Sequence, residues 1–350
     1  MPKPRLAWLL VFIPVSLVAE LGFHNEVLVF ATSGLAILPL AGLIGTATEQ
    51  LALHVGPRLG GVLNATLGNF AEIVIGIFLL LDDEFEIVKA SLTGSIIANL
   101  LLVLGLSFIV GGWRREEQHF SARAANTHGV SLLLAVVALT MPALFVNAGL
   151  RENTTQTEVV SGVVAAVLIV MYGGALLFSF VTHQHLFPAA VSEATPEWPI
   201  RKSVVVLIAA AGLVGLESEL LVGALEPAVE SWGLSKLFVG LILVPIIGNA
   251  AEHSSAIKFA RDDNMDVALE IAVGSSTQIA LLVAPLLVFV SLIAGHPMDF
   301  VFTTFEIAAV GLSTVVALFI SQDGRSNWLE GLQLVGAYAI MAVSFFFLRL

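Results

Sequence analysis

Long apolar stretches recur along almost the whole chain and constrain its fold more than any other feature. A helix that crosses a bilayer needs about 20 mainly apolar residues. Eleven windows meet this requirement, roughly 6–23, 26–48, 60–81, 87–111, 124–147, 157–181, 202–225, 235–258, 267–294, 299–320 and 328–348. Charged residues make up only 12% of the chain, whereas soluble domains average about 25%. We therefore predict an all-α integral membrane protein with eleven transmembrane helices.

The distribution of Lys and Arg predicts how these helices are oriented. If the N-terminus is cytoplasmic and the windows alternate, the inner side holds eleven of the fifteen basic residues, namely Lys3, Arg5, Arg58, Arg114, Arg115, Arg123, Arg201, Lys202, Lys258, Arg261 and Arg325. The outer side holds the other four, Lys89, Arg151, Lys236 and Arg349. Cytoplasmic loops are enriched in basic residues, so we expect the N-terminus inside and the C-terminus outside.

Two short signatures lie 180 residues apart, Gly-Asn-Phe-Ala-Glu at 68–72 and Gly-Asn-Ala-Ala-Glu at 248–252. When 68–104 is compared with 248–284, twelve of the 37 positions are identical, including the Gly-Asn, Glu, Asp-Asp and Gly-Ser positions. The repeated unit spans five helices, and because five is odd, the second copy enters the membrane from the opposite face. We expect an N-terminal extra helix (1–24), a first five-helix repeat (25–181), a cytosolic linker (182–201) and a second five-helix repeat (202–350). Inverted repeats of this kind are typical of secondary transporters, whose sites lie near the midplane.

Each signature places a carboxylate, Glu72 or Glu252, where a bilayer would otherwise contain hydrocarbon. Carboxylates at that depth are costly and are functional candidates by default. Gly and Asn are poor helix formers, so the Gly-Asn step is expected to break the helix. Asn69 and Asn249 lie three residues before the glutamates and therefore share a helix face with them. Two such copies supply oxygen ligands and two negative charges, which suit one divalent cation.

The following helix of each half contains further polar residues. Ser95 and Ser275 are candidate ligands, although small residues in membrane helices also mark close packing. Asn99 and Gln278 are candidates of the same kind. His253 has no counterpart in the first half, where Ile73 stands, and it either bonds a neighbouring helix or tunes the proton affinity of Glu252.

Two further acids are candidates for a proton or cation path. Glu49 closes the second window and Glu219 lies within the seventh. The alternative for either residue is a position at the membrane interface.

Other chemistries find no support in the sequence. The chain contains no Cys, which excludes disulfides and thiolate metal sites and leaves the oxygen and imidazole ligands that suit hard cations. We find no phosphate-binding glycine loop, no His-Glu-x-x-His and no segment large enough for a nucleotide-binding domain. The expected energy source is therefore the gradient of another ion, with no cofactor and no nucleic-acid partner.

The signatures resemble those of the calcium/proton exchangers, the cation/proton branch of the calcium/cation antiporter superfamily. The resemblance rests on 68–72, on Gly-Asn-Ala-Ala-Glu-His at 248–253, on 94–100 and on 274–280. It extends to Leu-Asn-Ala-Thr at 63–66 and Gly-Thr-Ala-Thr-Glu at 45–49. The Gly-Thr-Ser-x-Pro-Glu type of second motif found in sodium/calcium exchangers is missing. Phe70 stands where the family commonly has Ala, and the acidic cytosolic segment of eukaryotic relatives is reduced to Glu193 and Glu197.

The resemblance implies an antiporter that exports Ca²⁺ in exchange for protons, with Glu72 and Glu252 binding them alternately beside His253, Ser275 and Gln278. Its expected location is the cell membrane of a prokaryote. Its expected partners are the lipid bilayer, Ca²⁺ and protons. A homo-oligomer is possible, with a trimer as one guess. Sodium-coupled or monovalent cation/proton exchange, a passive cation channel and an intramembrane metalloenzyme are the alternatives. The last is disfavoured because such sites usually contain two or three His ligands.

Overall fold

The computed structural model describes residues 7–147, 154–183 and 195–348, and these residues are almost entirely helical. Within them, ten helices are long and apolar enough to cross a membrane: Glu26–Val55, Leu59–Leu81, Phe85–Gly112, Ala122–Val146, Thr155–Thr182, Ile200–Gly223, Lys236–Arg261, Met265–Ala294, Thr304–Ser321 and Trp328–Phe347. The first predicted window corresponds to a shorter apolar helix, Ala7–Phe23. The prediction of an all-helical, multi-pass membrane protein is confirmed. Glu193 lies outside the described residues.

Several spanning segments are divided into shorter elements. The first half contains η1 (Ala7–Val11), α1 (Phe12–Val18), η2 (Ala19–Phe23), α2 (Glu26–Val55), α3 (Pro57–Leu67), α4 (Phe70–Leu81), α5 (Phe85–Ile97), η3 (Ala98–Val103), α6 (Leu104–Gly112), α7 (Ala122–Asn147), α8 (Thr154–Leu177) and η4 (Phe178–Thr182). The second half contains α9 (Ile200–Gly223), α10 (Leu225–Trp232), α11 (Lys236–Phe238), η6 (Val239–Leu243), α12 (Val244–Arg261), α13 (Met265–Leu269), η7 (Glu270–Gly274), α14 (Ser275–Gln278), η8 (Ile279–Val283), α15 (Ala284–Ala294), α16 (Thr304–Ser321) and α17 (Trp328–Phe347). All of the η elements except the 3₁₀ helix η1 are π-helical turns.

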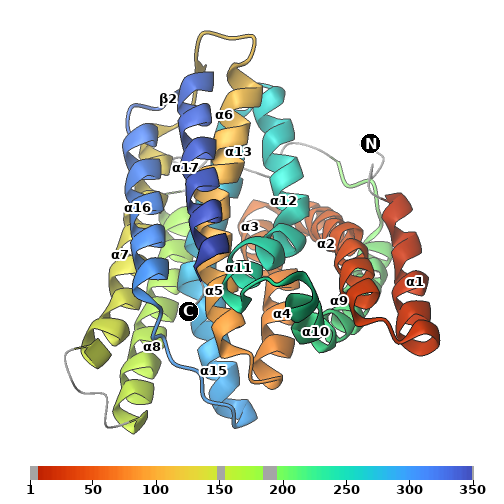
Figure 1. Cartoon of the computed structure of the whole chain (residues 1–350). Coiled ribbons are helices and arrows are strands. Elements are labelled where there is room, and N and C mark those ends of the chain that lie inside the picture. The colour runs from red at the N-terminus through yellow and green to blue at the C-terminus, as the bar shows by residue number, and fades with distance from the viewer. Residues whose placement is uncertain (1–6, 148–153, 184–194, 349–350) are drawn as a thin grey trace.

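The helices form a bundle in which the segments with the two signatures lie centrally. Helices α7, α8, α16 and α17 stand on one side, and α1, α2 and α9 gather on the other (Figure 1). Between them α12 packs against α2 and α6, while α5 packs against η6. Large apolar side chains on the outer surface are mostly exposed, for example Val170 at 74% and Phe319 at 73%. Such exposure is the mark of a surface that faces lipid.

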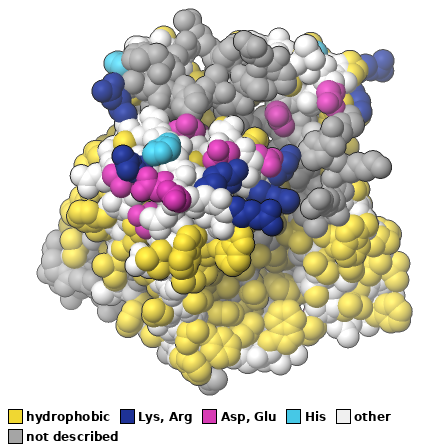
Figure 2. Space-filling view, turned by 90° about the horizontal axis from the view of Figure 1, so that it is seen from above, with side chains coloured by type: hydrophobic (Ala, Val, Ile, Leu, Met, Phe, Trp, Pro, Cys, Tyr) yellow, Lys and Arg dark blue, Asp and Glu magenta, His cyan; other side chains and the backbone are white. Residues whose placement is uncertain are grey.

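One end of the bundle has a polar surface. Two short strands that the sequence did not predict, β1 (Gln118–His119) and β2 (Arg325–Ser326), pair antiparallel there. Seen from above, charged side chains of both signs gather on one part of this end and hydrophobic side chains cover the adjoining part (Figure 2). Gln118 donates from Nε2 to Asp263 Oδ1 at 2.8 Å, which ties this end to the turn after α12.

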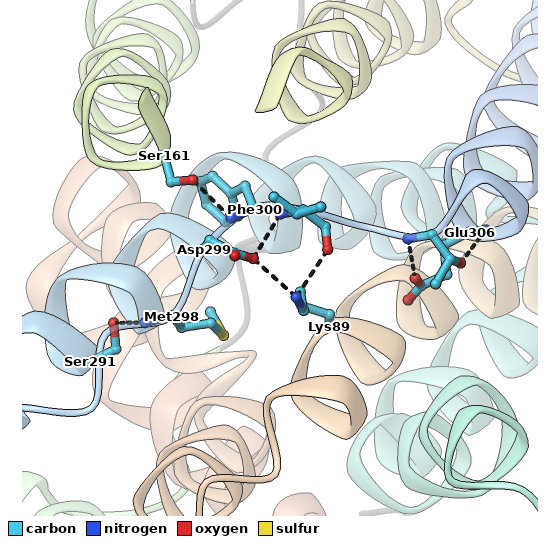
Figure 3. Close-up of polar contacts among 9 residues, drawn as sticks. Lys89, Ser161, Ser291, Met298, Asp299, Phe300 and Glu306 are labelled. Atoms are coloured by element: carbon cyan, nitrogen blue, oxygen red, sulfur yellow. Dashed lines mark hydrogen bonds and ion pairs between the residues drawn. The ribbon is translucent and has the colours of Figure 1, made fainter. Parts of the chain in front are cut away.

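At the opposite end, the loop 295–303 between α15 and α16 is held firmly. Lys89 Nζ donates to Asp299 Oδ1 at 3.0 Å and to the Val301 carbonyl at 2.9 Å, as Figure 3 shows. The N–H of Phe300 donates to Ser161 Oγ at 3.0 Å. The loop therefore connects α5 of the first half with α15 and α16 of the second.

Candidate functional site

The two signatures differ in their backbone. In the first, α3 ends at Leu67 and α4 begins at Phe70, so that Gly68 and Asn69 form the predicted break. In the second, α12 runs from Val244 to Arg261 without interruption, and the prediction of a broken helix is wrong there. The irregular backbone lies instead in η6, directly before Pro245. Proline has no N–H to continue the α-helical ladder, which accounts for a wide turn at that place.

Each glutamate lies beside the glycine of the other signature, Glu72 beside Gly248 and Glu252 beside Gly68. A Cβ atom added to Gly248 would lie 3.1 Å from Cγ of Glu72, and one added to Gly68 would lie 3.3 Å from Oε1 of Glu252. The two carboxylates are close enough to act on each other electrostatically. Glycine at both positions therefore leaves the room in which the opposite glutamate lies.

The asparagines and serines connect the halves in the same reciprocal way. Ser275 Oγ donates to Asn69 Oδ1 at 3.1 Å, and Asn249 Nδ2 donates to Ser95 Oγ at 3.0 Å. These two contacts correspond to each other under the 180-residue shift. All four side chains are at most 4% exposed, so the structure brings the predicted amide and hydroxyl groups together in the interior.

The second half carries additional hydrogen bonds. Ser275 Oγ also lies 2.7 Å from Glu252 Oε2, and Asn69 Nδ2 donates to Gln278 Oε1 at 2.8 Å. By contrast, Glu72 Oε1 and Asn249 Oδ1 are buried without a hydrogen-bond partner among the described residues. Glu72 borders a small cavity that is also lined by Ser95. Buried oxygens without a donor are a cost to the fold unless they receive a proton or a cation.

His253 forms a contact that has no equivalent in the first half. Its Nε2 lies 3.1 Å from Oδ1 of Asn99. The positions that correspond to these two residues are Ile73 and Ile279, so this contact makes the site asymmetric. Of the two readings of His253, the hydrogen bond to a neighbouring helix is observed, and an influence on Glu252 stays a prediction.

Two predicted residues are not part of this cluster. Glu49 is exposed near the end of α2, where the charges that act on it are Lys258 and Glu197. Glu219 is exposed on α9, whereas Glu217, two residues earlier, is fully buried and accepts a hydrogen bond from Ser16 at 3.0 Å. A path through Glu49 or Glu219 stays a prediction.

The sequence analysis missed a pair of ionisable residues within the spanning helices. His128 Nε2 on α7 lies 3.0 Å from Glu270 Oε2 on η7. The signal was present, because each is an isolated ionisable residue inside an apolar window, but neither lies in a repeated motif.

The chemistry of the central cluster suits a hard cation. Its donors are carboxylate, amide and hydroxyl oxygens, the ligands that Ca²⁺ prefers. Among the described residues, no group of three or more His, Cys, Asp and Glu side chains is placed to hold a metal ion. Any cation here would therefore be held by two carboxylates together with neutral oxygens.

Comparisons with known proteins identify the family. The sodium/calcium exchanger protein family matches residues 25–181 and 202–347. The chain is 44% identical to a Ca²⁺/H⁺ antiporter of Aphanothece halophytica, over 97% of this chain and 95% of that protein. It is 41% identical to the Ca²⁺/H⁺ antiporter ChaA of Bacillus subtilis, over 96% and 97% of the two chains.

Solved structures extend the comparison to the fold. The structure of native YfkE superposes with a TM-score of 0.86 at 38% identity and covers 98% of this chain and 100% of its own. The crystal structure of the H⁺/Ca²⁺ exchanger CAX has the same fold, with a TM-score of 0.76 at 17% identity, over 98% of this chain and 92% of its own. The chain therefore belongs to the calcium/proton antiporter family within the sodium/calcium exchanger superfamily, a family of transporters and not of enzymes.

Proposed function

We propose that this protein exports Ca²⁺ in exchange for protons, with Glu72 and Glu252 binding the two ions in turn. The observation that carries the proposal is that Glu72 lies beside Gly248 and Glu252 lies beside Gly68. It brings two carboxylates from different halves of the chain into one cluster of buried oxygens. Relatives that cover nearly the whole chain are Ca²⁺/H⁺ antiporters, which supports the same ions here.

The hydrogen bonds of Ser275 support binding of a proton in the absence of Ca²⁺. Its hydroxyl group has one hydrogen but faces two acceptors, Glu252 Oε2 at 2.7 Å and Asn69 Oδ1 at 3.1 Å. Both contacts are satisfied when Glu252 carries a proton, because the acid then donates to Ser275 and Ser275 donates to Asn69. A Ca²⁺ ion requires the same carboxylate without its proton, so that the two ions exclude each other.

Electrostatics favours the same alternation. Two nearby carboxylates repel each other, which disfavours having both charged in an empty site. One divalent cation or added protons relieve this repulsion. Exclusive binding of one or the other is what distinguishes an exchanger from a leak.

The proposed cycle uses the two halves of the chain. Residues 25–181 and 202–350 act as inverted repeats whose relative movement exposes the cluster to one face at a time, as in other transporters of this architecture. Ca²⁺ enters from the cytoplasm, and protons from outside displace it. We place the protein in the cell membrane of a bacterium, with the N-terminus inside.

The test is Ca²⁺ transport by purified protein in proteoliposomes. An imposed pH gradient is expected to drive ⁴⁵Ca²⁺ movement, and an imposed Na⁺ gradient of equal size is not. Glu72→Gln and Glu252→Gln should each abolish it, while Glu226→Gln, a surface residue paired with Lys236 at 2.7 Å, should not. Normal pH-driven transport by either of the first two variants would refute the assigned roles. Transport driven by Na⁺ alone, or flux without any counter-ion, would favour sodium coupling or a channel.

A further inference from the structure

Two interhelical interfaces occupy equivalent places in the two halves, but different ionisable residues lie in them. In the first, α5 meets α16 and its loop, where Lys89 pairs with Asp299 at 3.0 Å and Thr93 Oγ1 donates to Glu306 Oε1 at 3.2 Å. In Figure 3, Lys89 lies between Asp299 and Glu306. Adding 180 to the residue numbers of α5 gives the segment that begins with α13, and subtracting 180 from those of α16 gives α7. The equivalent interface therefore lies between α7 and that segment.

That second interface holds the pair of His128 and Glu270, with 3.0 Å between Nε2 and Oε2. The side chains are 16% and 35% exposed, and both residues lie within spanning helices. Ionisable groups at such positions are costly unless they are paired or functional. Lysine stays charged at physiological pH, whereas histidine is the side chain that exchanges its proton there. The second interface therefore holds a pair that can titrate, whereas the first holds a lysine that stays charged.

The pair is surrounded by helices that carry other ionisable groups. The helices that pack against α7 and η7 carry ionisable groups at their ends or on other faces, namely Arg123, Glu158, Glu252, His253, Lys258, Arg261, Asp266 and Glu306. The charge of Glu270 acts on His128, and the charge of His128 acts on Glu270. One proton, held on the imidazole and facing the carboxylate, therefore determines whether the pair is neutral or carries one negative charge.

The pair also lies close to the central cluster along the chain. Glu270 precedes Ser275 by five residues, which is about 7.5 Å along a helix axis. A Cβ added to the intervening Gly274 would lie 3.0 Å from Glu270 Oε1. On the other side, Thr277 Oγ1 donates to the His128 carbonyl at 3.4 Å. The pair thus lies between the central cluster and the face that carries the turn from α12 to α13.

We propose that His128 and Glu270 form a second proton-binding site that is coupled to Ca²⁺ in the central cluster. This inference rests on the proposed exchange of Ca²⁺ for protons. When Ca²⁺ binds centrally, its charge repels the proton on the pair. The Nε2–H bond of His128 breaks and the proton passes to water at the face of the α12–α13 turn. The remaining negative charge of Glu270 then favours the bound Ca²⁺.

The test measures the half-saturating Ca²⁺ concentration for transport in proteoliposomes while the pH is changed on one side of the membrane at a time. The chain has no Cys, so a single Asp262→Cys substitution in the turn, labelled by an impermeant maleimide, identifies the face. In the parent, raising the pH of that face from about 6 to about 8, the range in which a histidine titrates, lowers the half-saturating concentration.

Two variants separate a proton site from a structural ion pair. His128→Lys keeps the ion pair but does not titrate in this range, and Glu270→Gln removes the pair with little change in shape. Each is expected to reduce the pH-dependent change on that face, and the part that remains comes from proton competition at Glu72 and Glu252. His54→Lys, which changes an exposed histidine whose Nε2 lies 2.8 Å from the Trp198 carbonyl, should keep the parental response.

The outcomes are distinct. If His128→Lys keeps the parental pH response, the pair is only structural and the inference fails. It also fails if the lost response belongs to the opposite face. If His128→Lys does not fold, Glu270→Gln alone decides, and a parental response in that variant overturns the inference. A parent protein without pH-driven Ca²⁺ transport would instead refute the proposed function.

Discussion

Replacing Gly248 by Ala tests whether the crossing of the two halves forms the cation site. The substitution adds one methyl group, whose carbon would lie 3.1 Å from Cγ of Glu72 and 3.6 Å from its Cδ. Carbon atoms prefer separations of about 3.5–4.0 Å, so Glu72 has to move by roughly half an ångström. Gly248 lies inside α12, where Ala is a better helix former than Gly by about 1 kcal/mol. The fold should therefore tolerate the change.

The expected cost falls on ion binding. Ca²⁺ binds oxygen ligands at distances of about 2.3–2.6 Å. Moving Glu72 by half an ångström changes the distance from its oxygens to the ion by more than the width of that interval. Misplacing a reacting group by about 1 Å costs on the order of a hundredfold, so half of that should cost about tenfold, or about 1.4 kcal/mol. We expect the half-saturating Ca²⁺ concentration of Gly248→Ala to rise by about that factor.

The assay is ⁴⁵Ca²⁺ transport in proteoliposomes as a function of Ca²⁺ concentration, together with the Tm of the detergent-solubilised protein. Gly212→Ala on α9 is the matched control, because its added Cβ would meet nothing within 4 Å. If Gly248→Ala has the same Ca²⁺ dependence as the parent, the contact between Gly248 and Glu72 is not part of the cation site. An equal loss in Gly212→Ala would show that the effect does not act through Glu72.

Three further predictions follow from other parts of the molecule. Asp82→Cys and Asp262→Cys, which change exposed and equivalent positions, should be labelled by an impermeant maleimide from opposite faces of the membrane; labelling from one face would refute inverted repeats. His253→Ile removes the partner of Asn99 Oδ1 and should lower stability by about 1–3 kcal/mol in thermal unfolding. Adding Asn99→Ile should recover most of this loss, since the two equivalent positions, Ile73 and Ile279, are both isoleucine, and no recovery would contradict that reasoning. Gly94→Ala places its Cβ against the carbonyl of Leu241 and should greatly reduce the yield of folded protein on size-exclusion chromatography, whereas Gly336→Ala, which meets nothing within 4 Å, should not.

The positions of the spanning helices could be predicted because a bilayer imposes length and apolarity together. The ends were less accessible, as the second helix shows. Its window was predicted as 26–48, but the helix continues to Val55, since polar residues such as Thr46 and Glu49 are tolerated near a membrane surface. Its beginning at Glu26 is set by Asn25, whose Oδ1 accepts from the N–H of Leu28 at 3.0 Å. Local capping of this kind is readable from the sequence, whereas the two-residue strands have no periodicity to detect.

The membership of the central cluster was predictable from the repeat, but the partners within it were not. A repeat shows which residues are equivalent and does not show that Asn69 meets Ser275 of the other half. The backbone at Gly248 could not be read from its motif either, because the preceding Pro245 changes where the helix is irregular. His128 and Glu270 were missed because their significance depends on two helices that meet only in the folded protein.

The wide turns η3 and η8 shift the angular phase of the helices that contain them. They begin one position apart under the 180-residue shift, directly after the segments with Ser95 and Ser275. A π-helical turn accommodates one extra residue, which displaces everything beyond it by about 100° around the axis relative to an uninterrupted α-helix. In each half, the polar segment and the apolar segment beyond it can therefore present their faces independently. Deleting one residue from Ala98–Val103 would remove the wide turn and leave the side chains of α6 facing their present neighbours on α17, whereas an α-helix formed through this segment without a deletion would turn them away.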